Sequence, residues 1–106
     1  MSTDAYKSRG LMTQEKIFKI QVKYFLNIEG LSYFPTWYQE VLQEVKQQDG
    51  FMEITYDSLK SNPIISLSFS REEKLELWAS TKRHDELFEK IEAYFIQPVE
   101  VEIIEN

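Results

Sequence analysis

FKIQVKYFLNI, residues 18–28, decides the fold of this chain, because apolar and polar side chains alternate along it. Every even-numbered position is apolar, whereas lysine, glutamine and asparagine occupy most of the odd-numbered positions. A repeat of two residues is typical of a β-strand that buries one of its faces. The segment therefore predicts a strand whose even-numbered side chains point toward the core.

An amphipathic helix is predicted after this strand. Gly30 interrupts the alternation and Pro35 suits the first turn of a helix, so we expect the helix over residues 35–48. Gly50 can take the left-handed conformation that closes the far end. The face predicted to be buried carries bulky residues at helical spacing, namely Phe34, Trp37, Tyr38, Val41, Leu42 and Val45.

Two short strands joined by a tight connection are predicted next. The turn-prone residues 58–63 separate them, and so short a connection favours an antiparallel hairpin. In both strands apolar residues alternate with mostly polar ones. The apolar residues are Met52, Ile54 and Tyr56 in the first strand and Ile65, Leu67 and Phe69 in the second.

The second helical region is predicted in two pieces. Ser70 and Glu73 have the spacing of a capping box, which predicts a helix over residues 71–79. Either Ser80 or Thr81 can cap the second piece. Its apolar face comprises Leu87, Phe88, Ile91, Tyr94 and Phe95.

A last strand is predicted at the end of the chain. Pro98 is expected to end the preceding helix, because proline lacks the amide proton that an interior helical position uses. After it, glutamates alternate with the apolar residues Val99, Val101 and Ile103. This repeat of two again predicts a strand.

The order of these elements is that of an α+β, ferredoxin-like βαββαβ fold, with its helices on one face of an antiparallel sheet. The first strand then lies centrally beside the last, where its lysines, Lys19 and Lys23, would meet Glu100 and Glu102. We expect a second copy to cover the open face of the sheet, which predicts a homodimer. The apolar residues expected on that face are Phe25, Phe51, Ile64 and Ile104.

The size and charge of the chain exclude several classes of protein. Its 106 residues suffice for one core, so we expect a single domain over residues 16–105. Residues 1–15 are mostly polar and show no sustained periodicity, so we expect a flexible tail there. The 18 acidic and 12 basic side chains give a net charge of −6, which disfavours binding to nucleic acids and anionic membranes. No apolar run suits a membrane span or a secretory signal, so the cytoplasmic compartment is expected.

Metal and cofactor sites are not indicated by the residue types. The chain has no cysteine and one histidine, which excludes disulfides, thiolate metal sites and a typical four-ligand zinc site. Its three glycines form none of the nucleotide-binding patterns. We therefore expect neither a metal nor a bound cofactor.

Two segments resemble a known family. FPTWYQEVLQEVKQQDGF, residues 34–51, and FSREEKLELWASTKRHDELFEKI, residues 69–91, are similar to the corresponding segments of antibiotic biosynthesis monooxygenase (ABM) domains, which are dimeric α+β barrels. The resemblance extends over about residues 16–105 and implies a dimer with a cavity between sheet and helices. The family includes cofactor-free oxygenases of aromatic polyketides and haem-degrading enzymes. In some members an asparagine, a tryptophan and a histidine line the cavity, which implies catalytic candidates here: Asn27, Trp78 and His84.

The candidate residues also have structural interpretations. His84 could act as a general base or as an axial haem ligand, or it could be a partly exposed residue near the start of a helix. The aromatic residues Trp37, Tyr38, Tyr24 and Tyr56 could line a binding pocket with Trp78. At helical spacing, however, the tryptophans could equally be core residues.

Three functions are compatible with these observations, and whether the chain is an enzyme stays open. The leading hypothesis is a cofactor-independent monooxygenase that acts on a small hydrophobic aromatic compound. The second is a non-catalytic ligand-binding or stress-associated dimeric module that keeps the fold without the chemistry. The third is a haem-binding or haem-degrading protein.

Overall fold

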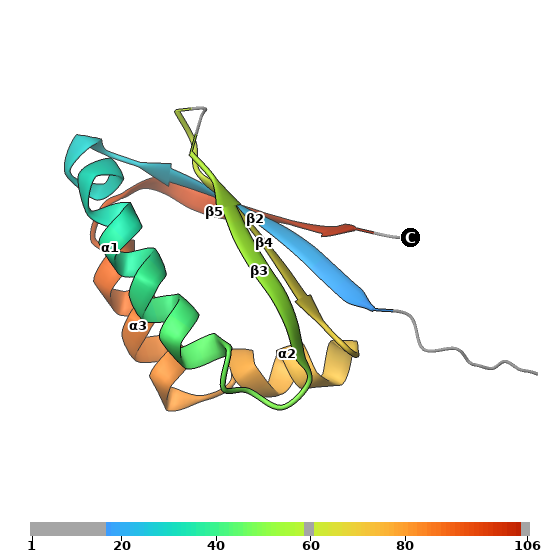
Figure 1. The fold of residues 1–106 in the computed structure, drawn as a ribbon. Coiled ribbons are helices and arrows are strands. Elements are labelled where there is room, and N and C mark those ends of the chain that lie inside the picture. Colours follow the sequence, from blue (N-terminus) through green and yellow to red (C-terminus); the bar gives the residue numbers. More distant parts are fainter. Residues whose placement is uncertain (1–16, 59–60, 105–106) are drawn as a thin grey trace, which may run out of the picture.

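The computed structural model describes residues 17–58 and 61–104. Along them the order is β2 (Phe18–Leu26), α1 (Ile28–Val45), β3 (Phe51–Asp57), β4 (Ile64–Phe69), α2 (Glu72–Ala79), α3 (Lys82–Glu92) and β5 (Phe95–Ile104). The strands form one antiparallel sheet in the order β3-β4-β2-β5. The helices lie on one side of this sheet (Figure 1). The predicted α+β, ferredoxin-like fold is confirmed, while the tail predicted at residues 1–15 lies outside the described residues.

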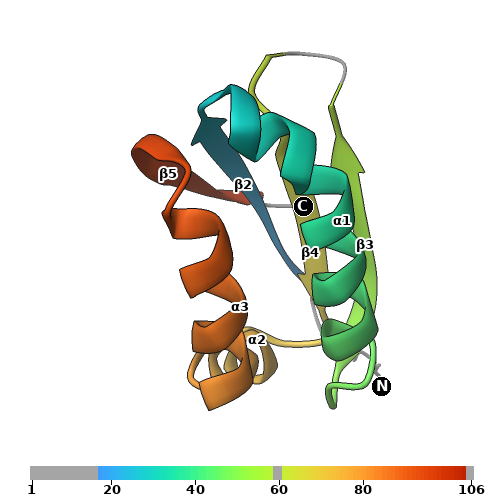
Figure 2. The ribbon, with the colours of Figure 1, turned by 90° about the vertical axis from the view of Figure 1, so that its left-hand side faces the viewer.

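The central strand β2 behaves as its alternation predicts. Its even-numbered apolar residues Ile20, Val22, Tyr24 and Leu26 are buried, and the intervening side chains are partly exposed. Helices α1 and α3 lie side by side over the buried face, and α2 lies near one end of the sheet (Figure 2). The core therefore fills the layer between β2 and the helices.

Helix α1 begins seven residues earlier than predicted, at Ile28 rather than residue 35. The side chain of Asn27 caps it, because its Oδ1 atom accepts a hydrogen bond of 2.8 Å from the Gly30 amide. Gly30 lies inside the helix and packs against Tyr94, whose Cβ atom would lie 2.5 Å from a Cβ atom added to the glycine. Gly30 thus allows the helix to approach Tyr94 closely and does not interrupt the helix. Pro35 is an interior residue of the helix.

The far end of α1 and the start of β3 also depart in detail from the prediction. The helix ends at Val45 rather than residue 48, and Lys46 rather than Gly50 caps it. Gly50 takes the expected positive φ, +87°, in the turn that leads to β3. A bulge in β3 follows immediately and places Phe51 opposite Phe69, with their rings edge to face. Phe51 therefore faces the helices rather than the open face predicted for it. Met52 is 50% exposed instead of buried.

The two short helices are capped differently. Thr81 caps α3 as predicted, since its Oγ1 atom accepts a hydrogen bond of 3.1 Å from the amide of His84. The capping box predicted for α2 does not form, because Arg71 rather than Ser70 occupies the cap position and makes no capping bond through its side chain. The amide of Ser70 instead bonds the carbonyl oxygen of Gly50 at 2.7 Å.

Strand β5 begins before Pro98, which was predicted to end the preceding helix. The helix ends at Glu92, so Tyr94 lies in a turn and Phe95 starts the strand. Proline is tolerated at this position because, among the described strands, β5 lies at an edge of the sheet. The pairing of β5 with β2 is irregular between Lys23 and Leu26, next to the proline.

The pairing across the open face of the sheet agrees only in part with the prediction. Lys23 lies opposite Glu100, as expected, whereas Lys19 lies opposite Ile104 and Gln21 lies opposite Glu102.

None of the described helices is long and apolar enough to cross a lipid bilayer.

Candidate functional site

A cavity of about 230 Å³ lies between the sheet and the helices. Strand residues form its floor, and α2 and α3 supply Leu75, Trp78, Ala79, His84 and Phe88. It reaches solvent at the edge of the sheet, since Val101 of β5 lines it and is 60% exposed. Aliphatic and aromatic side chains dominate the lining: Ile20, Val22, Val41, Ile54, Ile65, Leu67, Leu75, Phe88, Val99 and Val101.

Two of the three predicted catalytic residues meet at this cavity. The rings of Trp78 and His84 lie edge to face with centroids 5.3 Å apart. Trp78 is 4% exposed, and the His84 side chain is 19% exposed. The Thr81 cap places His84 in the first turn of α3, and the neighbouring helix α2 ends at Ala79 just after Trp78.

The imidazole of His84 carries a buried nitrogen without a hydrogen-bond partner. Within the described residues its Nδ1 atom is the one buried side-chain nitrogen or oxygen that lacks a partner. The Oδ1 atom of Asp85 lies 3.6 Å from it, too far for a good hydrogen bond but close enough for the carboxylate to favour a proton on Nδ1. Such a group calls for an explanation, because an unsatisfied buried polar atom is destabilising.

Burial lowers the pKa of His84 below its ordinary value of 6.5, and the nearby Asp85 carboxylate only partly opposes this effect. The imidazole is therefore neutral at pH 7, with one nitrogen free to accept a proton. A neutral imidazole in an apolar cavity can act as a general base on a bound molecule.

Tyr24, which the sequence analysis names as a possible pocket residue, also lines the cavity. It is 2% exposed, and burial raises the pKa of its phenol above the ordinary value of 10.0. The phenol therefore stays protonated at neutral pH. It also belongs to an aromatic cluster, with its ring 5.5 Å from that of Trp37 and 6.4 Å from that of Phe88.

The remaining sequence candidates do not line this cavity. Trp37 is fully buried and donates a hydrogen bond of 2.7 Å from Nε1 to the carbonyl oxygen of Leu87, which ties α1 to α3. Tyr38 and Tyr56 pack against each other with ring centroids 4.3 Å apart. Asn27 caps α1 through its amide oxygen. A role for these four residues in binding or catalysis stays a prediction.

Phe88 is the residue of the site that the sequence interpretation did not single out. Its ring stacks on the imidazole of His84, with centroids 4.4 Å apart and planes inclined by 24°. The signal was present in the sequence, because residues four apart on a helix lie on the same face. The helical spacing places Phe88 on the apolar face but does not by itself indicate a contact with His84.

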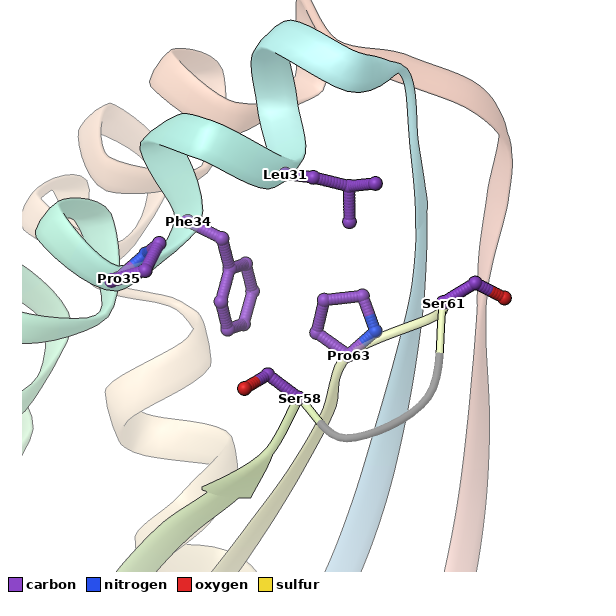
Figure 3. Close-up of a pocket in the computed structure, with 6 residues that line it drawn as sticks. All are labelled: Leu31, Phe34, Pro35, Ser58, Ser61 and Pro63. Carbon is purple, nitrogen blue, oxygen red and sulfur yellow. The ribbon is translucent and has the colours of Figure 1, made fainter.

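A second hollow lies between α1 and the β3–β4 connection (Figure 3). Its lining residues are Leu31, Phe34, Pro35, Ser58, Ser61 and Pro63. None of them titrates near neutral pH, so no proton acceptor faces a molecule bound there. The cavity beside His84 is therefore the better candidate for a functional site.

Solved structures of low sequence identity share this fold. An antibiotic biosynthesis monooxygenase has a TM-score of 0.75 at 14% identity, covering 84% of this chain and 97% of that chain. A conserved protein from Methanosarcina mazei Go1 has a TM-score of 0.77 at 12% identity, with coverages of 85% and 92%. SnoaB, a cofactor-independent oxygenase from Streptomyces nogalater, has a TM-score of 0.75 at 8% identity, with coverages of 85% and 92%. No family model matches the sequence, and no curated protein matches it.

At these identities the likeness is one of fold. The resemblance drawn from residues 34–51 and 69–91 is confirmed at that level, because the chain has the fold of ABM structures over most of its length. Fold alone does not determine activity, which depends on the residues of the site.

Proposed function

We propose that the chain is an ABM-type, cofactor-independent monooxygenase acting on a small hydrophobic aromatic compound in the cavity beside Trp78 and His84. The observation that carries the proposal is the neutral, largely buried imidazole of His84 among the lining of an otherwise apolar cavity. A neighbour in fold that is itself a cofactor-independent oxygenase supports it.

The chemistry requires a substrate that becomes electron-rich when it loses a proton. His84 takes a proton from a ring CH₂ group of the keto tautomer of a phenol, and the carbanion transfers an electron to O₂. Recombination of the two radicals gives a peroxide, and loss of water from it leaves a carbonyl group. The balance is CH₂ + O₂ → C=O + H₂O, so the substrate supplies all four electrons and no separate reductant is needed.

The apolar walls contribute to this reaction in two ways. They keep the imidazole neutral, because burial disfavours its protonated form. They also exclude water from the ionised substrate and its oxygen adduct, which limits side reactions. Tyr24 lines the same cavity as a protonated phenol and is the candidate donor to the ionised oxygen of the substrate.

A non-catalytic binding module is the second candidate. The observation that favours it is the position of Asn27, whose amide oxygen is already engaged by Gly30. The cavity thus has a proton acceptor and a donor but lacks the third polar group that the family resemblance implied. Such a protein would bind the same aromatic molecules without consuming oxygen.

Haem does not fit the cavity. Its volume of about 230 Å³ lies below the roughly 300–1,000 Å³ of ordinary ligand pockets, which are themselves filled by molecules smaller than a haem. No lysine or arginine is among the lining residues to pair with the propionates. The haem hypothesis therefore has no support in the geometry of the site.

We also propose that two copies pair through their open sheet faces. The lysines of β2 and the glutamates of β5 form adjacent rows of opposite charge on that face, with Lys23 opposite Glu100. A two-fold axis can bring the lysine row of one copy onto the glutamate row of the other. Phe25 and Ile64, which are partly exposed beside these rows, would then be covered.

Oxygen uptake tests the oxygenase proposal. An oxygen electrode would follow the purified chain with 1-naphthol and related phenols against a protein-free blank, and product analysis would look for the quinone. We expect uptake that falls at least 100-fold in His84→Ala, the usual scale of general-base catalysis. Leu77→Ala is the control, because Leu77 is 61% exposed on α2 and lies outside the cavity lining. Uptake equal to the blank, or unchanged in His84→Ala, rejects the proposal.

A further inference from the structure

We infer that the cavity selects neutral phenols of one or two rings over both larger ring systems and aromatic acids. The inference rests on the proposed function only for the reaction that follows binding, because binding itself can be measured without turnover. It is carried by three features of the lining: its volume, its lack of charge and the position of His84.

The volume limits the number of rings. A cavity of about 150 Å³ enclosed by apolar side chains is known to hold benzene, so a cavity of about 230 Å³ holds roughly ten heavy atoms. One aromatic ring with substituents, or two fused rings, is of that size. Three fused rings exceed it, and because the inner side chains Trp78 and Tyr24 are 4% and 2% exposed, the third ring would project past Val101 into solvent.

The lack of charge limits the ionisation state of the ligand. The lining contains no lysine or arginine. The nearest basic residue along α3, Arg83, is engaged by Glu44 at 3.5 Å and by Glu86 at 3.3 Å. A carboxylate in the cavity would therefore lose its water without gaining a cation, which is strongly unfavourable. A neutral hydroxyl group has a smaller desolvation penalty.

His84 gives the neutral ligand its orientation. Its imidazole lines the cavity, stacked on Phe88 and edge to face with Trp78. The Asp85 carboxylate, 3.6 Å from Nδ1, favours a proton on that nitrogen, which leaves Nε2 as the acceptor of the neutral ring. A phenolic hydroxyl is the smallest group that can donate to such an acceptor while its ring stays among the apolar walls. An unsubstituted hydrocarbon of the same size would leave the nitrogen unpaired.

A panel of four matched ligands tests this selectivity. Isothermal calorimetry with the full chain at pH 7.5 would compare 1-naphthol, naphthalene, 1-naphthoate and 9-anthrol. We expect 1-naphthol to bind about tenfold more tightly than naphthalene, on the scale of one hydrogen bond, and at least 100-fold more tightly than 1-naphthoate. We expect 9-anthrol to bind more weakly than 1-naphthol, because its third ring gains no apolar contact inside the cavity.

Two variants locate the binding in this cavity. Leu75→Ala enlarges the cavity from α2 and should tighten the binding of 9-anthrol, whereas Leu77→Ala on the exposed face of the same helix should not. Val99→Phe fills the cavity from the edge strand and should weaken 1-naphthol at least tenfold. Thermal melts establish that each variant is folded. Because Leu75→Ala enlarges the cavity and Val99→Phe fills it, either variant can test the inference if the other is unstable.

The outcomes separate this inference from the oxygenase proposal. Binding of 1-naphthol with the expected selectivity but without oxygen uptake supports the inference and rejects the oxygenase. Binding of 1-naphthoate or 9-anthrol as tightly as 1-naphthol overturns the inference. So does the absence of binding by every ligand in the panel.

Discussion

The imidazole of His84 stacks on the ring of Phe88, one helical turn further along α3, with centroids 4.4 Å apart. The same ring also meets that of Trp78 edge to face, with centroids 5.3 Å apart. This arrangement shields the imidazole from water, which is why burial is the largest contribution to its lowered pKa. The environment of the site thus depends on residues that have no acid–base chemistry of their own.

Phe88→Ala should raise the pKa of His84 toward 6.5, because water would occupy the space of the missing ring. NMR titration of the imidazole measures this directly, and the chain has one histidine, so the signal needs no further assignment. Phe88→Leu is the matched control and should keep the pKa low, since it preserves apolar contact. Equal pKa values in the wild type and Phe88→Ala would show that the stack does not control the imidazole.

Stability should fall with pH below 6.5 because of His84. Its folded pKa is depressed, so the unfolded chain binds the proton more readily than the folded chain does. The contribution is fully present above pH 6.5, is lost as the pH drops toward the folded value, and changes no further below it. Urea unfolding at pH 7.5 and pH 5 should show a larger loss for the wild type than for His84→Gln. Parallel losses would contradict the assignment.

Asn27→Ala should lower the free energy of unfolding by about 1 kcal/mol, because the Gly30 amide loses its capping partner. Asn27→Asp should retain most of the stability, since aspartate also caps helices. Urea titrations measure both variants. The pair also tests the predicted catalytic role of Asn27: if the residue only caps, oxygen uptake by Asn27→Asp matches the wild type, whereas a folded but inactive Asn27→Asp would place it in the reaction.

Trp37→Phe should destabilise the fold by about 1–3 kcal/mol, because the carbonyl oxygen of Leu87 loses a buried donor. The affinity for 1-naphthol should stay within threefold of the wild-type value, since Trp37 does not line the cavity. Trp78→Phe provides the contrast and should weaken binding. A large loss of affinity in Trp37→Phe would show that it contributes to the site after all.

Charge reversal tests the proposed pairing of two copies. Lys23→Glu places like charges opposite Glu100 on the open face and should raise the dimer dissociation constant at least tenfold in sedimentation experiments. The double variant Lys23→Glu with Glu100→Lys restores the opposite charges and should recover much of the association. A wild-type chain that sediments as a monomer at high concentration would remove the proposal.

Local patterns predicted most of the fold. The alternation in residues 18–28 identified the central strand, and the Thr81 cap and the left-handed Gly50 were both confirmed. The errors arose where contacts distant in sequence override local preference. Gly30 was interpreted as a break because its contact with Tyr94 is not visible in the sequence. Pro98 is predicted to end a helix, but it lies within β5. Proline is tolerated there because β5 is at the edge of the described sheet, and the sequence pattern does not show which strand lies at the edge.

The candidate site could be predicted only in part. Trp78 and His84 were selected by family resemblance and by the singular histidine, and the structure brings them together. The walls could not be predicted, because an inward-facing valine or isoleucine of a strand has the same pattern whether it borders a cavity or fills a core. The same limit applies to Trp37, because helical spacing alone does not distinguish a tryptophan packed in the core from one that lines a pocket. In the structure Trp37 packs between α1 and α3, where it donates a hydrogen bond to the carbonyl oxygen of Leu87.

Pro98 has a consequence for how the protein associates. An edge strand normally offers a row of free amide donors to any extended chain, and such edges can template open-ended aggregates. At Pro98 the row is missing a donor, and the adjacent irregularity in pairing distorts the strand. Exposed Ile96 beside it would otherwise make this edge adhesive. The proline thus makes β5 a poorer template for unlimited sheet extension.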